Sequence, residues 1–106
     1  MAIGRGTHLG LVLVRGRSMA PTFGGWRRLA IVEFGRSPRV GEVVLARRPD
    51  RPEQRVIKRV TARDAGGWWL ESDAHGDRTV FSDSWVFGPV SDTLLLGVVR
   101  WPRVSR

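Results

Sequence analysis

The chain has 106 residues, which is enough for one domain with a thin hydrophobic core. Hydrophobic residues make up 42% and charged residues 26%, a balance typical of globular rather than disordered proteins. The absence of cysteine excludes disulfides, thiol nucleophiles and thiolate metal sites. We therefore expect residues 1–106 to form a single domain.

The net charge of +8 would suit a protein that binds nucleic acid. The arginines are spread along the chain, however, with short pairs at Arg27-Arg28 and Arg47-Arg48 rather than one dense block. No helix-turn-helix pattern or RNA-binding aromatic motif accompanies them. We therefore expect a solvated basic surface and no nucleic-acid partner. A basic β-barrel module that binds nucleic acid or an acidic protein is the alternative.

The apolar runs are too short to cross a membrane as a helix. The run from Leu9 to Val14 has six residues, whereas a spanning helix needs about 20. It also lacks the small-residue cleavage site of a secretory signal. The sequence therefore predicts a soluble, cytoplasmic chain without a membrane anchor.

Six segments have the apolar and β-branched composition of strands, and turns containing Gly or Pro separate them. They are residues 9–16, 28–34, 42–48, 55–63, 68–72 and 93–101. A long polar loop is expected over residues 73–85. Because no segment keeps a 3.6-residue period, the sequence predicts an all-β fold.

The first strand leads to a candidate nucleophile. Alternation places Leu9, Leu11 and Leu13 on one side of this strand, with valines on the other. Ser18 follows in "RGRSMAPT", between Gly16, which allows a close backbone approach, and Pro21, which stiffens the turn. Such a turn can present a hydroxyl at the end of a rigid element, although a serine there is more often a simple turn residue.

The fourth strand carries the only lysine of the chain, whereas the other 17 basic side chains are arginines. Alternation places Lys58 on one face with Val56 and Val60. Burial there would lower the pKa of the amine from about 10.4 to about 7–8, at a cost on the order of 4 kcal/mol. A guanidinium cannot lose its proton in a protein, but such an amine can. A neutral Lys58 could then take the proton of the Ser18 hydroxyl, as in Ser-Lys variants of the catalytic triad.

Together, "GRSMAPT" and "RVIKRV" resemble the signal peptidase I family of Ser/Lys-dyad proteases, relatives of the LexA-type self-cleaving repressors. "VGEVVLAR" is similar to the strand that precedes the lysine segment in that family, and "SDAHGDRTVFSDSWVFGPV" with "LLLGVV" resembles its C-terminal box. The resemblance covers about residues 11 to 100, with the pieces in the family's order. It implies a small coiled antiparallel sheet or partly open barrel, a single catalytic domain and no cofactor or metal.

The resemblance assigns roles to individual residues. Ser18 would be the nucleophile, its backbone N–H would hold the oxyanion, and Lys58 would be the general base. Met19 would pack beside the dyad. The position that carries a second oxyanion hydroxyl in some relatives is Gly16 here. Substrate would add as a strand in a groove lined by Leu13, Val14, Arg15, Arg55, Val56 and Ile57. Structural support would come from an Arg59–Asp73 ion pair and from the box residues Asp83, Ser84 and Gly88.

Several positions depart from the family's pattern. The Gly-Asp-Asn of the box is Ser72-Asp73-Ala74, the expected Arg after Asp-Ser is Trp85, and Phe81 replaces a serine that hydrogen-bonds the lysine in many relatives. Ser82 or Thr79 could substitute for that serine, and Trp26 stands where an acidic residue is expected. These changes leave a catalytically degraded relative as an alternative.

The expected substrate is a precursor protein or peptide with an N-terminal leader, cut after a small residue such as Ala. Among family members, the chain resembles the short proteases that mature nickel-type superoxide dismutase. Self-cleavage is less consistent with the sequence, because no Ala-Gly site is visible. The alternation of Asp73, His75 and Asp77 could bind a metal, and His75 could serve a Ser-His-Asp triad, but polar loop chemistry explains the pattern more simply.

Overall fold

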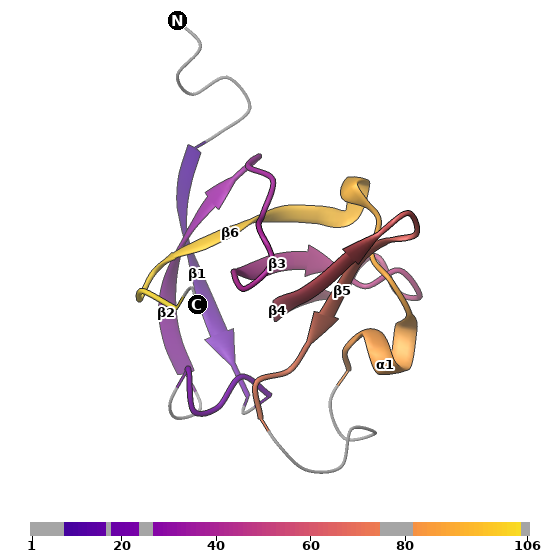
Figure 1. Cartoon of the computed structure of the whole chain (residues 1–106). Coiled ribbons are helices and arrows are strands. Elements are labelled where there is room, and N and C mark those ends of the chain that lie inside the picture. The colour runs from indigo at the N-terminus through magenta and orange to yellow at the C-terminus, as the bar shows by residue number, and fades with distance from the viewer. Residues whose placement is uncertain (1–7, 17, 24–26, 75–81, 105–106) are drawn as a thin grey trace, which may run out of the picture.

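The computed structural model describes residues 8–16, 18–23, 27–74 and 82–104. Within them the chain forms six strands, which agrees with the six segments expected from sequence (Figure 1). They are β1 (His8–Arg15), β2 (Arg27–Phe34), β3 (Val43–Arg47), β4 (Arg55–Asp64), β5 (Gly67–Glu71) and β6 (Leu95–Trp101).

The strands form one sheet in the order β1-β2-β6-β3-β4-β5, and all neighbouring pairs that contribute to it run antiparallel. The sheet is coiled but not closed, since β1 and β5 are its two edges. In Figure 1, β1 and β2 lie on one side of the molecule and β4 and β5 on the other, joined through β6 and β3. This confirms the predicted all-β fold and its partly open form.

Two short helical turns are absent from the sequence-based prediction. Helix α1 (Ser84–Phe87) lies in the segment expected to be a polar loop, and the 3-10 turn η1 (Asp92–Leu94) replaces the start of the predicted last strand. A helix of four residues is too short to show a hydrophobic period. Its one sequence signal is the N-cap Asp83, whose side chain accepts from the Trp85 backbone N–H. No helix in the described ranges combines the length and hydrophobicity needed to span a bilayer.

Strand β3 lies at the centre of the hydrophobic core and is buried on both faces. Val43 and Leu45 belong to one buried cluster, which also contains Met19 and Phe23 from the turn after β1. Val44 and Ala46 belong to a second cluster on the other face, with β4, β5 and the segment before β6. Continuous burial explains why "VVLA" is apolar throughout rather than alternating. The two clusters therefore pack β3 against the turn that carries Ser18 and against the strand that carries Lys58.

Strand β1 alternates as expected, but its leucine face is the outer one. Leu9 and Leu11 are 67% and 71% exposed, whereas Val14 is buried against the first core cluster. Only the face of β1 that carries the valines therefore contributes to the core.

Candidate active site

Ser18 lies in a turn that begins directly after β1. Gly16 has a φ of +87°, a conformation that L side chains rarely adopt, so the chain can turn sharply there. Met19, the residue after Ser18, is 2% exposed and packs into the first core cluster, which anchors the turn to the core. The Ser18 carbonyl accepts a hydrogen bond of 2.9 Å from the Ala74 backbone N–H, which links the turn to the segment after β5. The position of Ser18 is therefore fixed by the core contact of Met19 and by the hydrogen bond from Ala74.

Lys58 approaches this serine from the middle of β4. It pairs with Val44 across the β3–β4 ladder, and its residue is only 4% exposed. Its Nζ lies 2.6 Å from Ser18 Oγ, within hydrogen-bonding distance, although the two residues are 40 positions apart in sequence. The structure thus brings the single lysine and the candidate nucleophile into direct contact.

The environment of Lys58 disfavours its charged form. Desolvation by burial is the main cause, and it lowers the pKa of the amine from 10.5 to about 8. The carboxylates of Asp83 and Asp73 raise the pKa of Lys58, because they favour the ammonium. The Arg48 guanidinium lowers it, as desolvation does. At pH 7 about a tenth of the amine is therefore unprotonated and able to accept a proton.

A groove of about 400 Å³ opens beside Lys58, between β1 and the first half of β4. All six residues that the resemblance assigned to a groove line it: Leu13, Val14, Arg15, Arg55, Val56 and Ile57. In the described sheet β1 pairs with β2 alone, and β5 pairs with β4 only from Arg59 onward. Both walls therefore present backbone edges that no strand of this sheet occupies, as an added strand requires.

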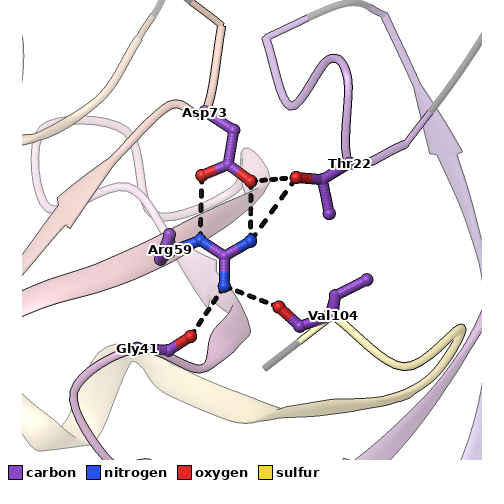
Figure 2. Close-up of polar contacts among 5 residues, drawn as sticks. All are labelled: Thr22, Gly41, Arg59, Asp73 and Val104. Atoms are coloured by element: carbon purple, nitrogen blue, oxygen red, sulfur yellow. Dashed lines mark hydrogen bonds and ion pairs between the residues drawn. The ribbon is translucent and has the colours of Figure 1, made fainter. Parts of the chain in front are cut away.

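Arg59, the residue after the lysine, organises a buried polar network (Figure 2). Its Nε and Nη2 donate to the two Asp73 carboxylate oxygens at 2.9 and 2.7 Å. Nη1 donates to the carbonyls of Gly41 and Val104, both at 2.6 Å, and the Thr22 hydroxyl also donates to Asp73. The expected ion pair therefore forms, and it connects β4 to the turn that carries Ser18.

The three box residues lie at the start and end of α1. The Asp83 carboxylate caps the helix and also accepts from the Ser72 backbone N–H at 3.0 Å. The Ser84 hydroxyl accepts from the Leu70 backbone N–H at 2.8 Å, and Gly88 ends the helix at a φ of +79°. These contacts fix α1 against β5, and so place the Asp83 carboxylate where it acts on Lys58.

The sequence interpretation missed Arg48, which is buried beside the groove at 7% exposure. Its Nη1 donates to the Ser82 hydroxyl at 3.0 Å, and Ser82 lines the groove together with Lys58. The place of Arg48 beside Arg47 in a short basic pair suggests a solvated position instead. Strand alternation would have identified it, because Val44, Ala46 and Arg48 point to one face.

Some of the predicted positions lie outside the described residues, namely Trp26, His75, Asp77, Thr79 and Phe81. The metal and triad hypotheses for the segment around His75 depend on them. Trp85, at the position of an arginine in the family's box, is exposed on α1 and meets Trp69 edge to face. In the described part of the chain, no group of three or more His, Asp or Glu side chains could hold a metal ion.

A family model described as Peptidase S24-like matches residues 2–84. That range covers most of the chain and includes both Ser18 and Lys58. No curated protein matches the sequence. The match supports the S24/LexA-like peptidase superfamily, and the narrower likeness to a superoxide dismutase maturation protease goes beyond it.

Proposed function

The chain belongs to the Peptidase S24-like family, and from that membership we propose that it is a serine endopeptidase with a Ser18/Lys58 dyad. The observation that carries this proposal is the 2.6 Å contact between the Ser18 hydroxyl and a buried amine whose pKa is about 8. A hydroxyl is a weak nucleophile until a base accepts its proton, and a neutral amine at this distance can do so.

In the proposed reaction, Ser18 Oγ attacks the scissile carbonyl carbon while its proton passes to Lys58 Nζ. The oxyanion accepts a hydrogen bond from the Ser18 backbone N–H. Lys58 then protonates the leaving amine, the C–N bond breaks and an ester to Ser18 forms. A water molecule hydrolyses this ester with Lys58 again as the base, which regenerates the free hydroxyl.

The proposed substrate is an extended segment of a precursor protein, bound as an additional strand in the groove between β1 and β4. Main-chain hydrogen bonds would supply affinity along both walls, and side-chain pockets would supply selectivity. Apolar groove residues such as Leu13 and Val56 suit small apolar side chains before the cut. The product would be a protein freed of its N-terminal leader, and the precursor of nickel-type superoxide dismutase is the specific candidate.

The test is cleavage of that leader-bearing precursor, with the products identified by mass spectrometry. We expect Ser18→Ala and Lys58→Met each to lower kcat/KM at least about a thousandfold, because either change removes proton transfer from the nucleophile. Lys58→Arg should be equally inactive, since it keeps the charge but cannot act as a base.

Circular dichroism of each variant controls for loss of the fold. Full activity in Lys58→Arg would exclude Lys58 as the base, and full activity in Ser18→Ala would exclude Ser18 as the nucleophile. If a panel of unrelated precursors is cut but the superoxide dismutase precursor is not, the protease assignment holds and that substrate is wrong.

A further inference from the structure

Arg47 and Arg48 are adjacent in sequence but differ in their surroundings. Arg47, the last residue of β3, is exposed, and its guanidinium donates to the Pro52 carbonyl. Arg48 is 7% exposed, which is rare for an arginine and costs desolvation energy unless its donors are satisfied. This burial requires a physical explanation.

Three contacts hold the Arg48 guanidinium in place. Nε and Nη2 form a bidentate pair with Asp50 at 2.9 and 2.7 Å, and Nη1 donates to the Ser82 hydroxyl at 3.0 Å. The guanidinium also lies over the Phe87 ring, 5.4 Å from its centroid. Its position is therefore fixed by the β3–β4 loop on one side and by α1 on the other.

The fixed guanidinium lies on the lysine side of the sheet. Cross-strand pairing puts Val44 opposite Lys58 and Ala46 opposite Val56, and alternation carries Arg48 to the same face. Ser82, which Arg48 holds, forms part of the groove wall together with Lys58.

Charged groups from several segments surround Lys58. The Asp83 carboxylate at the start of α1 favours the ammonium, as does Asp73, whose charge is paired with Arg59. Arg48 opposes both. The exposed Arg15 and Arg55 line the groove from β1 and β4, where water screens their charges.

We infer that Arg48 is a positioning residue for the dyad, which holds the Ser82 hydroxyl at the groove wall and a fixed positive charge on the Lys58 face of the sheet. This assignment rests on the function proposed above. Without that charge, the buried Asp83 carboxylate would favour the ammonium form of Lys58 more strongly, and the amine would be a poorer base at neutral pH. Arg48 offsets Asp83 and so preserves the uncharged amine.

Arg48→Met and Arg47→Met form a matched pair, since each removes one positive charge from adjacent positions. Because Lys58 is the only lysine, a chain labelled with carbon-13 at the lysine ε-carbon gives one side-chain signal to titrate by NMR. We expect Arg48→Met to raise the titration midpoint by about half a pH unit and Arg47→Met to leave it in place. In cleavage assays, Arg48→Met should lower kcat/KM about threefold at pH 7 and little above pH 9.

Equal midpoints in the two variants would overturn the assignment. If Arg48→Met does not fold, Asp50→Asn provides the second test. It removes the carboxylate paired with Arg48, while Ser82 and Phe87 still contact the guanidinium, and it should shift the midpoint to lower pH because the Arg48 charge is then less neutralised. A midpoint in Asp50→Asn that is unchanged or higher would likewise count against the role of Arg48. The NMR readout does not depend on catalysis, so a shifted midpoint in a protein that cuts nothing would count against the proposed function and retain only the effect of the Arg48 charge on Lys58.

Discussion

At the scale of single residues, the burial of Lys58 lowers both the pKa of the candidate base and the stability of the folded protein. Its pKa of about 8 in the fold lies below the 10.5 expected in the unfolded chain. Below pH 8 both states bind the proton, so the folded protein bears the full cost of a buried ammonium, about 3 kcal/mol. Between pH 8 and 10.5 only the unfolded state retains the proton, and stability therefore rises with pH.

We predict that Lys58→Met stabilises the protein at pH 7 by up to about 3 kcal/mol while abolishing cleavage. The difference should shrink as pH rises from 8 towards 10.5, because the wild-type amine then loses its proton in the fold. Urea unfolding at pH 7 and pH 10 measures both values, with Ser18→Ala as a control that keeps the lysine. Parallel stability curves for wild type and Lys58→Met across this range would show that the amine is not desolvated.

At the scale of elements, the sequence was informative where a local pattern decides the structure. Val56, Lys58 and Val60 share a face as alternation predicts, and this pattern together with the single-lysine composition points to the candidate base. Alternation also separated the two faces of β1, but it could not predict that the leucine face points outward, because exposure depends on which segments pack against the strand.

Contacts between distant segments were less accessible to sequence reasoning. The short distance between Ser18 and Lys58 depends on how the sheet coils, and no local sequence pattern encodes this. The family resemblance implies the contact instead. The burial of Arg48 depends on Asp50, Ser82 and Phe87, which come from two separate segments. Helix α1 was missed because four residues carry no period and tertiary contacts of Asp83 stabilise it.

The free edges of β1 and of the first half of β4 give an element-scale prediction about the substrate. If the substrate adds as a strand between these two edges, its successive backbone N–H groups point alternately to β1 and to β4, so each of them has a partner. Peptides N-methylated at one residue held between the two edges should therefore show kcat/KM about tenfold or more lower at each such position, whereas methylation outside that segment should have little effect. Competition assays against the unmodified peptide measure this pattern. Tolerance of N-methylation at every position would contradict strand addition.

At the scale of the whole molecule, the Arg59 network joins segments that the sheet alone does not connect. It links the turn that carries Ser18, through Thr22, to the segment after β5, through Asp73, and to the C-terminal segment, through Val104 (Figure 2). Both side chains of the ion pair are only 4% exposed. Such a pair contributes little net stability when it is intact, but removal of one partner leaves a buried charge uncompensated.

We predict that Asp73→Asn lowers the free energy of unfolding by about 3 kcal/mol or more, because the Arg59 guanidinium would remain buried without a counter-charge. The matched control is Glu33→Gln, which breaks the more exposed Arg100–Glu33 pair at 2.8 Å and should cost less than about 1 kcal/mol. Urea unfolding of both variants gives the comparison. Because the Ala74 N–H next in sequence holds the Ser18 carbonyl, cleavage by Asp73→Asn should also fall under conditions in which the variant remains folded. Equal losses of stability in the two variants would show that the Arg59 network is no more important to this fold than a surface ion pair.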